Sequence, residues 1–250
     1  MRCAERARRG WPWKGGTVTP ERELALFDLD FTLVPFDSGM QWVRFLMAGG
    51  MLEAGFDDAY LALCRRYVAG EGDAAAPHRF MLGSLARLRA DELPALQRRF
   101  AATLADAVPK AAHALVAGHR TAGHVCCIVT ATTRAIAAPF AGLFGIEHLI
   151  ASEAQRDSGG RHTGEISGEL CHGVAKVRRV AGWLQSRGED WYDYPRTTFY
   201  SDSSSDLPLL SAVSHPVAIR PDETLRRHAA QQGWPVFDDL QALHAVRARS

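Results

Sequence analysis

The stretch LALFDLDFT at residues 24–32 decides the fold of this chain. Its apolar start and acidic end are typical of a buried strand whose carboxyl end carries polar side chains. In an extended segment, side chains two residues apart point the same way, so Asp28 and Asp30 are expected to face one site. Two such carboxylates repel each other, and their pKa values separate unless a cation intervenes. The pair fits a nucleophile with a general acid/base, although D-x-D alone fits a surface Asx-turn equally well.

Two further apolar runs end in polar residues in the same way. Val125–Val129 runs into Thr130, and Thr198–Tyr200 is followed by Asp202. Shorter strand candidates are His148–Ala151 and Pro216–Ile219, and the helices between strands are expected at Lys110–Thr121, Thr133–Phe144 and Val174–Ser186. This alternation predicts a Rossmann-like, three-layer α/β core with a parallel sheet. Ligands of such sheets bind at the carboxyl ends of the strands, where these polar residues lie.

Residues 35–108 interrupt the alternation. Apolar residues recur at helical spacing in four segments, Gly39–Ala48, Asp57–Ala69, Pro77–Arg89 and Glu92–Leu104, and no strand pattern occurs between them. The sequence therefore predicts an all-helical cap domain at 35–108, an α/β core at 22–34 and 109–250, and a basic, disordered tail at 1–21. The glycine-rich, alternating stretch at 156–169 predicts a β-hairpin.

Composition excludes several classes of function. The 250 residues are 47% hydrophobic and 23% charged, with a net charge of +1, so neither nucleic acid nor a membrane surface is an expected partner. No apolar run approaches the ~18 residues of a membrane span, and no apolar region follows the arginine-rich start. The five scattered cysteines indicate buried thiols and a reducing, cytoplasmic location. The ten histidines show no zinc-binding spacing.

Lysine is rare in this sequence. Of 29 basic residues only Lys14, Lys110 and Lys176 are lysines. A chain that uses arginine almost everywhere else indicates that an ammonium group is needed where lysine is kept. Lys176 follows Gly173 at the start of an expected helix, which makes it a candidate site residue.

Taken in order, these motifs resemble those of the haloacid dehalogenase superfamily of phosphohydrolases. The segment Asp28–Thr32 resembles its first motif, D-x-D-x-T/V. Thr130 resembles the second, Lys176 the third, and Asp202–Asp206 the D-x-x-x-D fourth. The helical insert is similar to that of the phosphoserine phosphatase subgroup, and residues 199–208 are similar to the IB hydrolases.

The resemblance implies Mg²⁺-dependent hydrolysis of a small phosphate monoester. Asp28 would form an aspartyl-phosphate, and Asp30 would act as general acid and then base. The Mg²⁺ ligands would be Asp28, the Asp30 carbonyl and Asp202, with Asp206 steadying the metal's waters or Lys176. Thr130 and Lys176 would bind the phosphoryl group. The expected partner is a small phosphorylated metabolite.

The substrate is indicated less directly. Asp37 falls where phosphoserine phosphatases carry a glutamate that meets the substrate amine, but it fits the N-cap of the next helix equally well. Arg79, Arg65 and Arg66 are candidates for binding a substrate carboxylate. If no arginine reaches the site, an amino-alcohol phosphate such as histidinol phosphate, phosphoethanolamine or phosphocholine is favoured over phosphoserine. Ser205, where those enzymes tend to carry asparagine, also departs from the phosphoserine phosphatase pattern.

Two alternatives remain at the sequence level. A phosphotransferase or mutase would pass the phosphoryl group to a hydroxyl group other than water. A regulatory module would merely become phosphorylated on Asp28, although receiver-like domains are about half this length and have no inserted cap.

Overall fold

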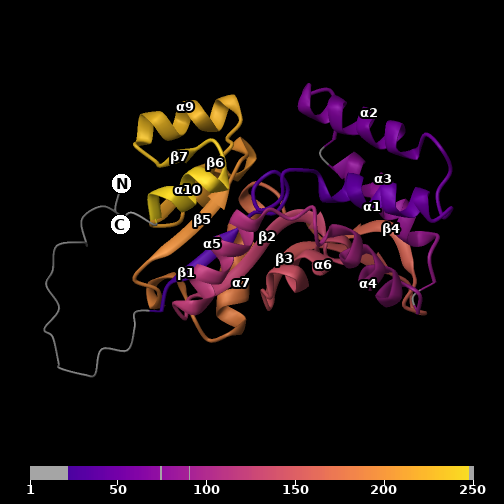
Figure 1. Ribbon diagram of the computed structural model, residues 1–250. Coiled ribbons are helices and arrows are strands. Elements are labelled where there is room, and N and C mark those ends of the chain that lie inside the picture. Colours follow the sequence, from indigo (N-terminus) through magenta and orange to yellow (C-terminus); the bar gives the residue numbers. More distant parts are fainter. Residues whose placement is uncertain (1–21, 74, 90, 248–250) are drawn as a thin grey trace, which may run out of the picture.

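A mainly parallel β-sheet forms the centre of the molecule in the computed structural model, which describes residues 22–73, 75–89 and 91–247 (Figure 1). Across these residues the sheet has seven strands in the order β4-β3-β2-β1-β5-β6-β7. The strands are β1 Leu24–Phe27, β2 Val125–Thr133, β3 His148–Arg156, β4 His162–Ser167, β5 Thr197–Ser201, β6 His215–Ile219 and β7 Val236–Phe237. All neighbours are parallel except β3 and β4. The predicted α/β fold is confirmed, and β1 occupies the middle of the sheet.

Helices cover both faces of the sheet. In β1, Ala25 and Phe27 pack into one hydrophobic cluster, and Leu24 and Leu26 pack into the other. The first cluster includes side chains of α5 Lys110–Thr121, α6 Arg134–Phe144 and α10 Leu240–Arg247. The second includes side chains of α7 Val174–Ser186, α8 Leu207–Leu210 and α9 Glu223–Gln232. Because alternate residues of a strand point to opposite faces, the continuous apolar run of β1 is what a doubly covered sheet requires.

The inserted helices form the predicted cap. They are α1 Ser38–Ala48, α2 Phe56–Val68, α3 Ala75–Ala86 and α4 Leu93–Leu104. Trp42, Leu82 and Phe100 are fully buried between them. The Phe100 ring also meets Phe140 of α6, with ring centroids 5.9 Å apart, so the cap core continues into the core below it. In Figure 1 these helices gather at one end of the molecule, away from α9 and α10.

The predicted hairpin is also confirmed, but its strands extend further than expected. β3 runs through Arg156 and pairs antiparallel with β4. β4 then lies against α3 of the cap, where a Cβ added to Gly164 would be 3.8 Å from Ala86 Cβ. β2 and β3 are longer than predicted, because strand pairing continues into polar residues at their ends, where no apolar pattern indicates a strand. The helices α9 and α10 were not predicted.

Other sequence-level expectations meet the structure only in part. Among the described residues, the four cysteines are free thiols, and Cys126, Cys127 and Cys171 are buried. No helix of the described chain is both long and apolar enough to cross a bilayer. The expected tail at 1–21 lies outside the described residues. The exact domain boundaries and the cytoplasmic location remain predictions.

Candidate active site at the carboxyl edge of the sheet

A sharp turn after β1 places the first motif. Asp28 continues the strand by donating its backbone N–H to the Tyr200 carbonyl at 2.9 Å. The N–H of Leu33 then returns to the Leu29 carbonyl at 3.0 Å. Within the turn Phe31 has a φ of 56°, a left-handed conformation that costs a non-glycine residue roughly 1–3 kcal/mol. Strain of this kind is commonly found at functional sites, where the surrounding structure holds it in place.

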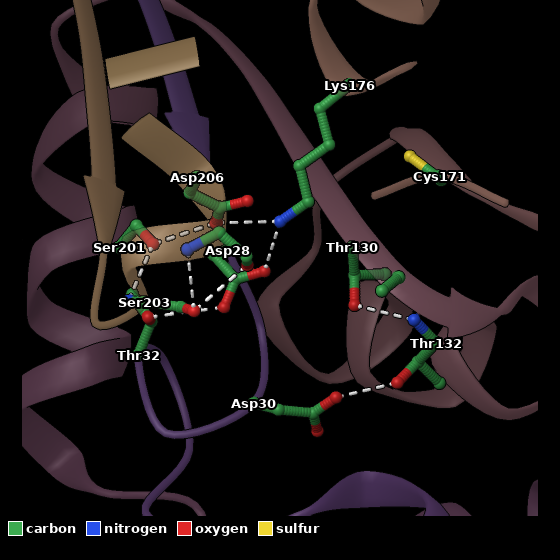
Figure 2. A network of polar contacts seen from close by, with 12 residues as sticks. Asp28, Asp30, Thr32, Thr130, Thr132, Cys171, Lys176, Ser201, Ser203 and Asp206 are labelled. Carbon is green, nitrogen blue, oxygen red and sulfur yellow. Dashed lines mark hydrogen bonds and ion pairs between the residues drawn. The ribbon is translucent and has the colours of Figure 1, made fainter. Parts of the chain in front are cut away.

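Lys176 lies between two carboxylates, as Figure 2 shows. Its Nζ is 2.8 Å from Asp28 Oδ1 and 2.8 Å from Asp206 Oδ2. Ser201 donates its hydroxyl to the same oxygen of Asp206, also at 2.8 Å. All three ionic side chains are buried. Burial alone would lower the pKa of Lys176, but the charges of Asp206 and Asp28 outweigh it and raise the pKa, so the ammonium form is maintained.

Asp28 and Asp202 form a second, unbalanced pair. The Thr32 hydroxyl is 3.3 Å from Asp28 Oδ2 and 3.2 Å from Asp202 Oδ1, and its single proton can serve only one of them at a time. Burial raises the pKa of Asp28 to about 7, with Lys176 opposing the rise and Asp206 adding to it. Burial, together with the charge of Asp28, raises the pKa of Asp202 to about 8. The negative charge at this point exceeds what the described side chains neutralise.

A divalent cation fits this excess of charge. The available donors are carboxylate oxygens, which a hard ion such as Mg²⁺ prefers. Asp206 Oδ1 is buried and has no hydrogen-bond partner among the described residues, so it can accept from a metal-bound water. In the described chain no three His, Cys, Asp or Glu side chains form a ready cage. The remaining ligands would therefore be water and a backbone carbonyl, for which Asp30 is the candidate.

Asp30 is held by the cap and by β2. Its Oδ1 accepts the Ser38 backbone N–H at 2.6 Å, and its Oδ2 accepts the Thr132 hydroxyl at 2.6 Å. Burial, and then the charge of Asp37, raise the pKa of Asp30 to about 6, against the effect of these hydrogen bonds. A carboxyl group with this pKa can give up and take back a proton near neutral pH.

The Asp37 carboxylate caps a helix but has no cationic partner among the described residues. Its Oδ1 accepts the Met40 backbone N–H at 2.7 Å, so the predicted N-cap of α1 is confirmed. The Tyr60 hydroxyl lies 3.2 and 3.3 Å from its two oxygens. Burial raises the pKa of Asp37, and no ion pair of this carboxylate is found in the described part of the chain. An ammonium group of a ligand would supply the missing partner.

The structure also shows where Thr130 and the candidate arginines lie. Thr130 is buried, and its hydroxyl accepts the Thr132 backbone N–H at 3.1 Å. Arg79 is half-exposed and pairs with Asp73 at 2.8 Å and Glu165 at 3.6 Å. It is therefore not brought to the acidic cluster, which consists of Asp28, Asp30, Asp202 and Asp206. The other two candidate arginines, Arg65 and Arg66, lie on α2 and are exposed.

Neither aspartate of the fourth motif uses its side chain to cap the short helical turns that follow. Ser203, rather than either aspartate, caps the short 3₁₀ turn Ser204–Asp206 with its side chain. Asp202 and Asp206 are therefore both available to the site. The structure thus brings together Asp28, Asp30, Asp202, Asp206 and Lys176 from three separate stretches of sequence.

Two residues that contribute to the site, Thr132 and Arg220, were not predicted from the sequence. Thr132 could have been found, since it lies two residues after Thr130 on one strand and shares its direction. Arg220 gave no signal among so many arginines. Its guanidinium donates to the Phe31 carbonyl at 2.9 and 2.7 Å and to the Thr32 carbonyl at 2.9 Å, which anchors the strained turn.

Comparison with known proteins agrees with this geometry. The profile of the haloacid dehalogenase-like hydrolases matches residues 25–211. A histidinol-phosphatase of Neisseria meningitidis serogroup C is 37% identical over 87% of this chain and 99% of its own. Phosphoserine phosphatase SerB1 of Mycobacterium tuberculosis is 32% identical over 89% of this chain and 73% of its own. A crystal structure of a Bordetella pertussis Tohama I protein of unknown function is 40% identical, with a TM-score of 0.80 over 87% of this chain and 99% of that one.

Proposed function

The chain belongs to the haloacid dehalogenase-like hydrolase family, and from this premise we propose that it hydrolyses the phosphate monoester of an amino alcohol, with histidinol phosphate as the preferred substrate. The family relatives are phosphatases, so hydrolysis of a phosphate monoester is the class of reaction. The observation that carries the substrate proposal is Asp37, a partly buried carboxylate close to Asp30 with no cationic partner among the described residues.

Asp28 is the nucleophile in this proposal. Lys176 holds its Oδ1, which leaves Oδ2 to attack phosphorus. As the new O–P bond forms, the bond from phosphorus to the leaving oxygen breaks, and protonated Asp30 gives that oxygen its proton. Asp30, now a carboxylate, takes a proton from water, whose oxygen attacks the aspartyl-phosphate and releases inorganic phosphate. A pKa of about 6 suits a group that must serve as both acid and base.

The charges around Asp28 support the transfer. Asp28, Asp202 and the Asp30 carbonyl would hold Mg²⁺, which supplies positive charge against the phosphoryl oxygens when it is bound. Lys176 would neutralise part of the same charge, and Asp206 keeps its ammonium in place at 2.8 Å. Thr130 lies beside Thr132 on β2, and its hydroxyl accepts the Thr132 backbone N–H, which leaves the hydroxyl proton to be donated to the phosphoryl group.

Phosphoserine is disfavoured by the residues around Asp37. A substrate carboxylate needs a cation, but the cap arginines considered for that role are exposed or paired elsewhere. The side chains close to the start of α1 are instead uncharged: Met81 Cε and the Tyr60 hydroxyl would each be 2.9 Å from a Cβ added to Gly39. The names of both relatives indicate amine-bearing phosphate monoesters as substrates. Uncharged side chains around Asp37 favour histidinol phosphate, which has no carboxylate, over phosphoserine.

The chemistry is tested with Asp28→Asn. In the presence of Mg²⁺, a panel of phosphate monoesters should be hydrolysed by the wild type, and the variant should lose about 10³-fold or more in kcat because the amide cannot attack phosphorus. Asp58→Asn, an exposed position on α2, is the matched control and should keep full activity. Products are analysed with and without acceptor alcohols. Full activity of Asp28→Asn would refute the mechanism, and a phosphorylated acceptor would refute simple hydrolysis.

Recognition of the amine is tested with Asp37→Asn. Asparagine caps a helix as well as aspartate does, so α1 should be unchanged while the charge is lost. We expect KM for histidinol phosphate and phosphoethanolamine to rise about 10- to 100-fold, a loss of roughly 1.4 to 3 kcal/mol in binding. KM for glycerol phosphate should be unaffected. An equal rise for glycerol phosphate would remove Asp37 from substrate recognition.

A further inference from the structure

Two tyrosines on one face of α2 contact residues close to the site. Tyr60, Cys64 and Tyr67 recur at i, i+4 and i+7, so they lie on the same side of the helix. Tyr60 reaches Asp37. Tyr67, about 10 Å further along the helix axis, reaches across to the core. There its hydroxyl is 2.9 Å from His172 Nε2, and the two rings meet edge to face.

His172 ties this contact to the phosphate end of the site. It immediately precedes Gly173, the N-cap of α7, and lies one helical turn before Lys176. Burial, and then the charge of Lys176, lower the pKa of His172. The Tyr67–His172 pair therefore joins cap and core beside the ammonium group that faces Asp28 and Asp206, with an imidazole that is neutral at pH 7.

The neighbouring helix α3 adds a second histidine. His78 and Met81 are three residues apart and share one side of α3, whereas Arg79 projects to Asp73 and Glu165. Burial, and then electrostatic repulsion from the nearby His172, lower the pKa of His78 to about 4. No hydrogen bond or ion pair of the His78 side chain is found among residues 22–73, 75–89 and 91–247. Its ring nitrogens are therefore free to meet a ligand.

We propose that Tyr67, His78 and His172, here called the histidine wall, form the specificity subsite for a neutral heteroaromatic ring on the leaving group. This inference rests on the proposed function and deepens it. The Tyr67–His172 hydrogen bond leaves the Tyr67 hydroxyl one further role, and the neutral imidazole of His78 keeps one donor and one acceptor. The wall therefore matches a planar ring that carries a donor and an acceptor. It offers no cation to a carboxylate. Phosphate at Lys176, amine at Asp37 and ring at the wall account for the three branches of such a substrate.

The wall is tested by the ratio of two specificity constants. Phosphoethanolamine has the amine and the phosphate of histidinol phosphate but no ring. We expect wild type to prefer histidinol phosphate, and His78→Ala to reduce the ratio of kcat/KM values about tenfold or more, mainly through KM for the ring-bearing substrate. His78→Gln should restore part of the ratio, because the amide supplies a donor and an acceptor. His244→Ala, at an exposed position of α10, is the matched control and should leave the ratio unchanged.

A second variant separates recognition from folding. Tyr67→Phe keeps the ring and its packing but removes the hydroxyl that meets His172, and the ratio should fall about three- to tenfold. If neither Tyr67→Phe nor His78→Ala changes the ratio, the wall is not a ring subsite, while the proposed function stands. If wild type hydrolyses neither amine-bearing substrate but does hydrolyse other monoesters, the proposed function itself fails and the wall assignment fails with it.

Discussion

At the scale of single residues, the carboxylates of the site outnumber the side chains that can donate a hydrogen bond or a positive charge to them. Lys176 satisfies Asp28 and Asp206, but the Thr32 hydroxyl must be shared between Asp28 and Asp202. Removing one partner of a buried charged pair costs more than the pair contributes, because the remaining charge is left without compensation. The raised pKa values of the aspartates therefore record a site built to receive further positive charge.

Thr132 offers a test of how Asp30 is tuned. Thr132→Val keeps the side-chain shape but removes the donor to Asp30 Oδ2. Losing a hydrogen bond to the charged form raises the pKa of Asp30 further, so less carboxylate is present at a given pH and the acidic limb of the kcat–pH profile moves to higher pH. We expect a shift of about one unit, measured between pH 5 and 8.

Thr133→Val is the matched control for this change. The Thr133 hydroxyl is buried without a hydrogen-bond partner in the described structure, so valine should leave the pH profile in place and should not lower stability. A Thr132→Val profile that coincides with wild type would show that this hydrogen bond does not tune Asp30.

At the scale of elements, the β3–β4 hairpin links the core sheet to the cap. β4 lies against α3, and Gly164 has a φ of 91°, which favours glycine. A Cβ at this position would also meet Ala86 and Gly83 of α3 at 3.8 to 3.9 Å. Because α3 carries His78 and Met81, the hairpin helps to set the orientation of the helix that faces the site.

Gly164→Ala should therefore strain the hairpin. The left-handed backbone makes us expect a loss of about 1 kcal/mol or more in the free energy of unfolding, measured by urea denaturation. Gly182→Ala is the control with the opposite sign. Gly182 is exposed within α7 with no atom near an added Cβ, so alanine there should stabilise the protein by roughly 0.5–1 kcal/mol. A stabilised Gly164→Ala variant would contradict the argument.

At the scale of the whole molecule, cap and core are held as one body by a shared hydrophobic cluster and by contacts at the site. Phe100 of the cap packs on Phe140. Ser38 of the cap and Thr132 of β2 bind the two carboxylate oxygens of Asp30, and their hydroxyls lie 3.1 Å apart. Repulsion between Asp28 and Asp202 acts against this assembly. Binding of a cation at that point should therefore stabilise the entire fold.

Mg²⁺ should raise the melting temperature of the wild type relative to a chelator. At 100 times its Kd a ligand adds about 2.7 kcal/mol, which corresponds to roughly 5–10 °C for a chain of this size. Asp202→Asn should lose this increment. In chelator the same variant should melt above wild type, because one of two repelling carboxylates is gone. Asp58→Asn should behave as wild type in both conditions, and an unchanged Mg²⁺ increment in Asp202→Asn would refute the assigned ligand.

The sequence by itself determined the sheet and the acidic cluster. Apolar runs that end in Asp28, Thr130 and Asp202 define parallel strands, and the carboxyl ends of parallel strands must meet at one edge. Lys176 was found because lysine is so rare in this chain. These signals are local, since a strand's period and a residue's scarcity can be read without knowing the packing.

Only the tertiary structure decided which cap residues face that cluster. His78 and Arg79 are adjacent in sequence, yet one lies beside His172 and the other pairs with Glu165 on the hairpin. Successive helix residues differ by about 100° in direction, so the rotation of α3 against α2 and β4 selects between them. Arg220 reaches the Phe31 turn for the same reason, through packing between distant segments that no local pattern encodes.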